Sequence, residues 1–110
     1  MSKLAYMVVD ARSSDPARMM EYRRLAQGAV EKFGGRYLVR GAPYTTLEGD
    51  WQPERLVVLE FPSMEIARQF YDSPEYGAAR AVREGVSDFD MLLAEAYVSV
   101  PSGGDGILGY

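Results

Sequence analysis

The sequence contains neither cysteine nor histidine. Without these side chains, disulfides, thiol nucleophiles, Cys/His zinc sites and histidine-ligated haem are excluded. A histidine general base is excluded as well, so any proton transfer must use Asp, Glu, Tyr, Lys or bound water. No loop of Asp, Asn and Gly has the spacing of a calcium site. We therefore expect no cofactor and no bound metal.

A basic surface and a long apolar segment are also missing. The formal net charge is -4, and no cluster of Lys or Arg offers a basic face for phosphates or for an acidic membrane surface. No apolar run approaches the roughly 20 residues of a transmembrane helix, and the N-terminus lacks the pattern of a signal peptide. We therefore expect no nucleic acid and no membrane as partner, and a cytoplasmic location.

The residues that are present describe one ordinary globular domain. The chain has 110 residues, of which 47% are hydrophobic and 25% are charged. This length and composition predict a single domain over residues 1–100. The glycine-rich residues 101–110 follow it and are expected to form a flexible C-terminal tail.

Strand and helix patterns alternate along the domain. Residues 4–9, 36–41, 55–61 and 89–100 have the composition of strands, and a loop rich in Gly and Pro joins the second to the third. Ser14-Asp15-Pro16 and Pro62-Ser63 begin helices, and Asp72-Ser73-Pro74 interrupts the second one.

This order predicts an α+β fold, a ferredoxin-like β-α-β-β-α-β arrangement with an antiparallel sheet. Its connections predict that the first and third strands lie side by side and parallel, with the second and fourth strands at the edges. Both helices are expected to cover the same face of the sheet.

The other face of the sheet is expected to be open, and strand alternation assigns side chains to it. The predicted open face carries Leu4, Tyr6, Val8, Arg36, Leu38, Arg40, Leu56, Val58, Glu60, Met91, Leu93, Glu95 and Tyr97. These residues are too apolar for water but include four charges and two phenols. We therefore predict a homodimer in which two sheets face each other and enclose a cavity.

Several motifs together resemble a known family. They are Gly34-Gly35-Arg36-Tyr37-Leu38-Val39-Arg40-Gly41, Leu47-Glu48-Gly49, Trp51-x-Pro53-x-Arg55, Glu60-Phe61-Pro62-Ser63 and Phe70-Tyr71-x-Ser73-Pro74-Glu75-Tyr76. From about residue 4 to residue 98 the chain resembles the domain of unknown function 1330 family. The resemblance implies a subunit of the dimeric α+β barrel superfamily, which includes haem-binding enzymes, cofactor-free monooxygenases, lactone isomerases and proteins with no known reaction.

Charged residues of the predicted inner face are the first candidates for a site. Antiparallel pairing is expected to place Arg36 near Glu60, and Glu95 near Tyr6. With Arg40, these residues can bind a small acidic or phenolic ligand, and Glu60 is the predicted catalytic base. The alternative is that they are paired ions that fix the register of the dimer.

The long loop and the second helix supply the remaining candidates. Glu48, Trp51 and Arg55 can form a cap over the barrel mouth, since loops on rigid scaffolds often carry function. Alternatively, Trp51 plugs the open end while Glu48 and Arg55 pair to hold the loop. Tyr76, on the second helix, is a candidate for ligand contact, with a packing role as the alternative.

Two functions remain open. The first is a cofactor-independent enzyme of isomerase, cyclase or monooxygenase type, acting on a small aromatic or carbonyl compound in the barrel cavity. The second is a non-catalytic homodimeric ligand-binding or interaction module. A cavity of about 300 Å³ or more with convergent polar groups favours the enzyme, because ligand sites have this size.

Overall fold

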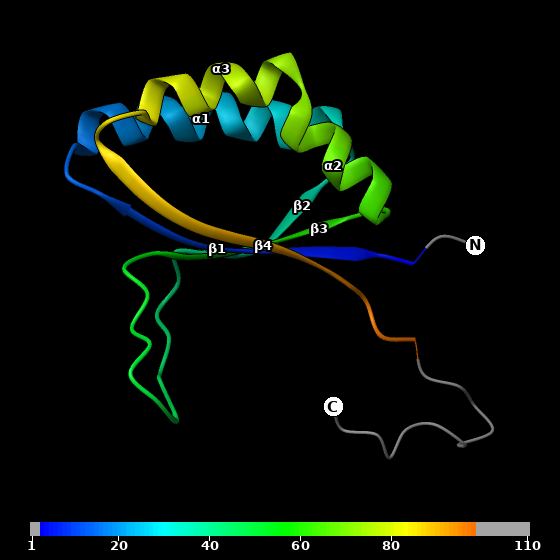
Figure 1. The fold of residues 1–110 in the computed structure, drawn as a ribbon, viewed down its shortest axis with the longest axis horizontal. Coiled ribbons are helices and arrows are strands. Elements are labelled where there is room, and N and C mark those ends of the chain that lie inside the picture. Colours follow the sequence, from blue (N-terminus) through cyan, green and yellow to red (C-terminus); the bar gives the residue numbers. More distant parts are fainter. Residues whose placement is uncertain (1–2, 99–110) are drawn as a thin grey trace.

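The computed structural model describes residues 3–98, so the predicted tail of residues 101–110 lies outside the described residues. The elements follow in the order β1 (Ala5–Ser13), α1 (Pro16–Lys32), β2 (Arg36–Arg40), β3 (Leu56–Phe61), α2 (Met64–Asp72), α3 (Pro74–Arg83) and β4 (Ser87–Glu95). The predicted ferredoxin-like order is confirmed, with the second helix divided into α2 and α3 at Ser73 (Figure 1).

The four strands form one antiparallel sheet in the order β2-β3-β1-β4. The predicted edge positions of the second and fourth strands are confirmed. The prediction that the first and third strands are parallel is wrong, because β1 pairs antiparallel with β3. The crossover through α1 returns β2 in the direction of β1, and β3 then runs back between these two strands. All three helices cover one face of this sheet (Figure 1).

The helices begin where the sequence predicted. Asp15 caps α1 by accepting a hydrogen bond from the backbone N–H of Arg18, and Pro16 occupies the first turn. Ser63 caps α2 in the same way, and Ser73 ends α2 and caps α3. Among residues 3–98, no helix has the length and apolar character needed to cross a membrane.

The first strand continues four residues beyond its predicted end at Val9 because the charge of Asp10 is compensated inside the sheet. Asp10 is 4% exposed. Its carboxylate accepts hydrogen bonds from Arg12 Nη1 at 2.6 Å, from Trp51 Nε1 at 3.2 Å and from the backbone N–H of Glu54 at 3.1 Å. A buried carboxylate with three donors can remain in a strand.

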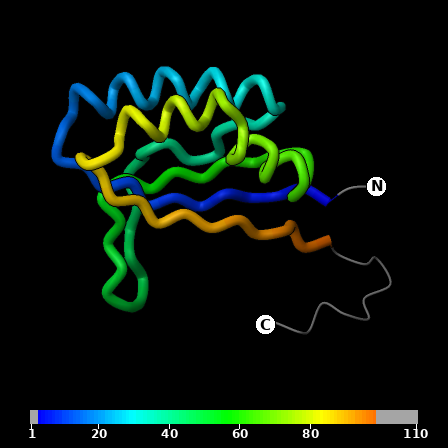
Figure 2. The backbone as a smooth tube through the Cα atoms, turned by 45° about the horizontal axis from the view of Figure 1, so that its top comes forward, coloured from blue at the N-terminus to red at the C-terminus, as the bar shows by residue number. Residues whose placement is uncertain are grey.

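The core fills the space between the helices and the sheet. Its largest fully buried side chains are Phe61, Phe70, Tyr76 and Val30. The ring centroid of Phe70 lies 4.9 Å from that of Phe61 and 4.6 Å from that of Tyr76, so an aromatic stack connects β3 to α2 and α3. Figure 2 shows from a second direction that the helices form one layer and the sheet the other.

Two glycines provide a matched test of this packing. A methyl group on Gly35 would lie 2.6 Å from Cε1 of the buried Phe61 ring, whereas one on Gly28, inside α1, would meet no atom within 4 Å. We expect Gly35→Ala to lower the free energy of unfolding by about 1–3 kcal/mol through overpacking. Gly28→Ala should raise it by about 0.5–1 kcal/mol, since alanine favours the helix. Urea denaturation measures both, and equal effects of the two substitutions would contradict the packing around Phe61.

A bulge in β2 changes which side chains face the helices. Tyr37 pairs with Leu59, but Val39 pairs with Val58 and Arg40 with Val57, so β2 contains one extra residue. The bulge turns Val39 to the open face and Arg40 to the helix side. The predicted position of Arg40 on the open face is therefore wrong, because strict alternation fails across a bulge.

The faces of β4 are the reverse of those predicted. Leu93 pairs with the buried Met7, and Met91 pairs with the buried Val9, so both face the helices. Leu92 pairs with Val8 on the open face and is 59% exposed. The assignment of Met91, Leu93 and Glu95 to the open face is wrong, because the neighbours Leu92 and Leu93 suit either face equally well. The strand begins at Ser87 and ends at Glu95, whereas the predicted strand ran over 89–100, of which residues 99–100 lie outside the described residues.

The open face carries an apolar row across the whole sheet. The cross-strand pairs Val39 with Val58, Val58 with Val8, and Val8 with Leu92 place one such residue on each strand. We call these four residues the central apolar row. None of the three helices covers it (Figure 1).

Candidate functional site

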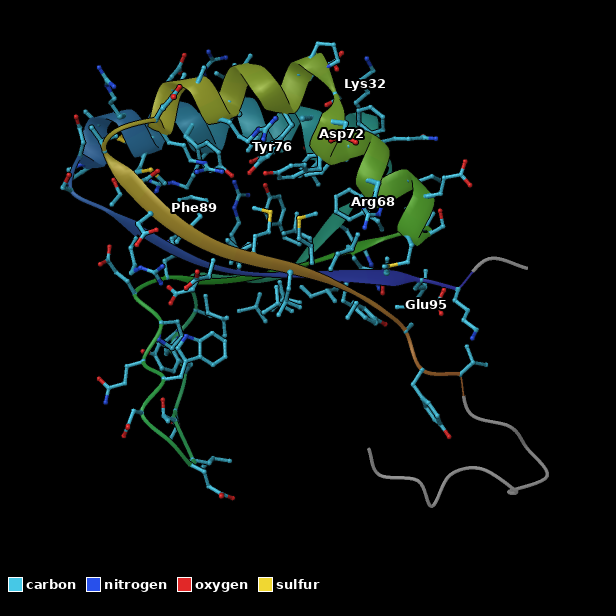
Figure 3. All side chains as sticks on the ribbon, in the orientation of Figure 1. Lys32, Arg68, Asp72, Tyr76, Phe89 and Glu95 are labelled. Carbon is cyan, nitrogen blue, oxygen red and sulfur yellow. The ribbon has the colours of Figure 1, made fainter. Side chains whose placement is uncertain are left out.

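An apolar cavity lies between the helices and the sheet, on the opposite side of the sheet from the predicted one. Its volume is about 50 Å³. The side chains that surround it come from β1, α1, β2, β3, α2, α3 and β4, and from Arg55 just before β3. Figure 3 places Tyr76 and Phe89, two of these residues, between α3 and the sheet. All of the described residues that line the cavity belong to one chain.

Two buried tyrosines provide polar groups inside the cavity. The hydroxyl oxygens of Tyr22, on α1, and Tyr76, on α3, are hydrogen-bonded at 2.7 Å. Burial raises the pKa of Tyr22 well above its usual value, and the neighbouring Tyr76 adds to this shift. Tyr22 therefore remains a neutral phenol, which can donate or accept a hydrogen bond. The predicted candidate Tyr76 thus lines a cavity and also packs in the core.

Arginines surround the opening of the cavity. Arg23 from α1, Arg40 from β2 and Arg55, which precedes β3, all line it. The Arg40 guanidinium lies 4.1 Å from the ring centroid of Tyr37, within the range of a cation–π contact. Burial, followed by the proximity of Arg23 and Arg40, lowers the pKa of Arg55. We call Arg23, Arg40 and Arg55 the arginine cluster.

A surface depression of about 300 Å³ adjoins the arginine cluster. It shares Ala11, Met19, Arg23 and Arg55 with the lining of the internal cavity. The internal cavity alone is much smaller than the 300 Å³ expected of a ligand site, whereas the depression reaches this size. A ligand can therefore place a small apolar part inside and a charged part among the arginines.

Gly41 holds Arg55 in place at the opening. Its φ angle is +70°, a conformation that favours glycine, and a methyl group added to it would lie 2.2 Å from Arg55 Nη1. The guanidinium of Arg55 therefore packs directly on the backbone of Gly41. The first residue of the long loop thus has two separate reasons to be glycine.

The loop between β2 and β3 projects away from the helices, beyond the open face (Figures 1 and 2). Trp51, an exposed residue of this loop, is tethered by its hydrogen bond to Asp10 and does not plug the interior of the chain. Within residues 3–98, Glu48 and Arg55 form no ion pair with each other. The alternative in which these two residues hold the loop is therefore wrong.

The predicted open-face candidates lie apart from the cavity. Glu60 is paired with Arg36 at 2.7 Å, as predicted, and Tyr6 is its cross-strand neighbour on β1. Glu95 is opposite Ala5 rather than Tyr6, and its ion pair is with Lys3 at 3.7 Å. The role of Glu60 as a base stays a prediction, and its pairing with Arg36 is the geometry expected of a structural ion.

Sequence reasoning missed three residues of the cavity: Arg23, Tyr22 and Tyr37. None of the three was among the site residues predicted from the sequence. Arg23 had no local signal, because it follows Tyr22 at the margin of the apolar face of α1.

No group of three or more acidic residues able to hold a metal ion occurs among residues 3–98.

The fold defines the class of the protein as a ferredoxin-like α+β domain. A protein of unknown function from Rhodopseudomonas palustris superposes with a TM-score of 0.70 at 18% identity, over 90% of this chain and 86% of that chain. SnoaB, a cofactor-independent oxygenase from Streptomyces nogalater, gives a TM-score of 0.59 at 13% identity, over 91% and 99%. A dimeric ferredoxin-like protein of unknown function from a Jannaschia species gives 0.59 at 14%, over 86% and 99%.

The family is shown by sequence. The chain belongs to the family described as domain of unknown function (DUF1330), whose family model matches residues 4–97. No match was found among curated proteins. The resemblance inferred from the motifs is therefore confirmed, and the structural similarities establish a shared fold.

Proposed function

We propose that the chain is a cofactor-independent enzyme that acts on a small aromatic or carbonyl compound bound between the helices and the sheet. The observation that carries the proposal is the convergence of buried phenols and an arginine cluster on one apolar cavity. The fold shared with SnoaB, a cofactor-independent oxygenase, supports it.

The side chains of the cavity suit a substrate that reacts through its own conjugate base. A positive charge within about 4–6 Å lowers the pKa of an acidic group by about 1–3 units. The arginine cluster would therefore stabilise a phenolate or enolate, and Tyr22 would supply a neutral hydrogen bond to the same oxygen. Isomerisation and cyclisation can both proceed from such an anion without a change of oxidation state.

A monooxygenase reaction can begin from the same anion, with the substrate as the reductant. Molecular oxygen would convert a CH₂ group next to the ionised centre into a carbonyl group. Two C–H bonds break, one oxygen atom enters the product and the other leaves as water with both hydrogens. The four electrons come from the substrate, so the reaction needs no external reductant.

Turnover of small phenols and enolisable carbonyl compounds tests this proposal. The purified protein, with a metal chelator present, is incubated in air while oxygen consumption and product masses are measured. We expect turnover by the wild type and a loss of about 100-fold or more in kcat/KM in the Arg40→Met/Arg55→Met double variant. Substrate binding without turnover would favour the alternative, a non-catalytic homodimeric ligand-binding module.

Glu60→Gln tests which side of the sheet holds the reaction site. Glu60 is 15% exposed and paired with the exposed Arg36, so we expect a loss of about 0.5–1 kcal/mol in the free energy of unfolding. Turnover should persist, because the cavity lies across the sheet from Glu60. Loss of turnover in Glu60→Gln, with full activity in the double arginine variant, would return the site to the open face.

We also propose that the open face forms a homodimer with a second copy of the chain. The central apolar row would otherwise remain in contact with water. The dimeric ferredoxin-like relative from Jannaschia supports a dimer of this fold. A cytoplasmic location remains the expectation from composition.

A further inference from the structure

We infer that the compound bound in this cavity is an aromatic anion, with its negative group among Arg23, Arg40 and Arg55 and its ring directed toward Tyr22 and Tyr76. The inference rests on the proposed function, because it names the substrate class of the same site. Aromatic carboxylates and phenolates share the required chemistry, a planar ring with a negatively charged oxygen.

The arginine cluster has no counter-ion among the described residues. Within residues 3–98, none of its three guanidinium groups forms an ion pair or a hydrogen bond. Other arginines of the same chain do: Arg24 is paired with Glu21 at 2.8 Å and Arg36 with Glu60 at 2.7 Å. Like charges that converge without compensation are unfavourable, and a bound anion would remove this cost.

The fold brings the arginine cluster together from segments that are distant in the sequence. Its members come from α1, the end of β2 and the residue before β3. The bulge in β2 is what turns Arg40 to the helix side, and Gly41 is what leaves space for the guanidinium of Arg55. Two backbone irregularities therefore act together to bring two of the cations to the cavity opening.

The lining of the cavity beyond the arginine cluster suits an aromatic ring. Beyond the cluster, the cavity is lined by apolar and aromatic side chains, with the linked hydroxyls of Tyr22 and Tyr76 inside it. An inorganic anion would leave this space unused. A single aromatic ring with one anionic group uses both parts, since the ring can pack on the aromatic wall while the anion accepts from the guanidinium groups.

One carboxylate faces the same depression and must be considered. Glu54 lines it together with Arg23 and Arg55, but its carboxylate accepts a hydrogen bond from the backbone N–H of Ser13 at 3.1 Å and forms no ion pair among the described residues. Its negative charge would oppose an incoming anion. Glu54→Gln should therefore strengthen anion binding rather than weaken it.

The test compares benzoate with benzamide, which has nearly the same shape but no charge. Isothermal titration calorimetry on the full-length protein measures the dissociation constant of each compound. We expect benzoate to bind the wild type at least about tenfold more tightly than benzamide. This preference should disappear in Arg55→Met and Arg40→Met, and it should persist in the matched control Arg24→Met, whose guanidinium is exposed and paired with Glu21.

Several results would overturn the inference. They are equal binding of benzoate and benzamide by the wild type, an equal loss in Arg24→Met, and a benzoate affinity unaffected by Arg55→Met. If Arg55→Met fails to fold, the salt dependence of wild-type binding replaces it. Benzoate affinity should fall severalfold when the salt concentration is raised from 50 to 500 mM, while benzamide affinity stays constant.

The inference and the proposed function can fail separately. Selective benzoate binding without turnover of any compound would support the anion site and refute the enzyme. Turnover of neutral compounds that benzoate does not inhibit would support the enzyme and refute the anion site.

Discussion

Leu92→Asp is expected to convert the proposed homodimer into a monomer. Leu92 ends the central apolar row, on the face that no helix covers, and 59% of it is exposed in the single chain. An aspartate there would place an unpaired charge between two sheets, which costs several kcal/mol. A two-fold dimer contains the substitution twice, so we expect the dissociation constant of the dimer to rise by at least about 100-fold. Sedimentation velocity over a concentration series measures it.

Two matched variants show whether the effect is specific to the face. Met20, on α1, is also a large exposed hydrophobic residue, at 67%, and Met20→Asp should leave the dimer intact. Leu93→Asp should instead unfold the chain, because Leu93 packs against the core. A Leu92→Asp protein that remains a dimer as tight as the wild type would rule out this interface.

Tyr76→Ala is expected to cause a large loss of stability. Tyr76 is 1% exposed, and its ring contacts Phe70, Tyr71 and Tyr22. Removing a buried aromatic ring costs about 3–5 kcal/mol, a large part of the 5–15 kcal/mol of a typical domain. Urea denaturation at a fixed protein concentration measures this loss, since dimerisation makes stability depend on concentration.

The hydroxyl of Tyr76 can be separated from its ring. Tyr76→Phe removes the partner of the Tyr22 hydroxyl and leaves a buried phenol unsatisfied, at a cost of about 1–3 kcal/mol. Adding Tyr22→Phe removes that group as well, so the double variant should lose less stability than the sum of the two single variants. Strict additivity would show that the two hydroxyls do not interact.

Much of the fold could be predicted because its signals are local. Asp15, Ser63 and Ser73 cap helices through their own side chains. The direction of β3 relative to β1 was predicted wrongly. The correct direction follows from the order of the elements: the crossover through α1 leaves β2 parallel to β1, and β3 runs antiparallel to β2 and therefore to β1.

The faces of β2 and β4 show where strand alternation stops being informative. In β2, the extra residue between Tyr37 and Val39 reverses the alternation, and nothing in the sequence of that strand marks it. In β4, Leu92 and Leu93 are equally suited to either face. Asp90 lay within the predicted strand and, like Asp88, shares a face with Leu92, so its charge was a signal for the open side that the prediction did not use.

The candidate site could be predicted only in part, because it is assembled by tertiary structure. Arg40, Arg55 and Tyr76 were named from the sequence, but they were not expected to meet around one cavity. Arg23 joins them from α1 only after the helix packs on the sheet. The charges that were expected to act together, Glu60 and Glu95, are separated by the register of β1 with its two neighbours.

A crystal structure of the homodimer grown with benzoate tests the central claim most directly. The account predicts the carboxylate within hydrogen-bond distance of Arg40 or Arg55, and the ring between the helices and the sheet, beside Tyr22 and Tyr76. Benzoate bound between the two sheets, against Tyr6 and Glu60, would contradict it.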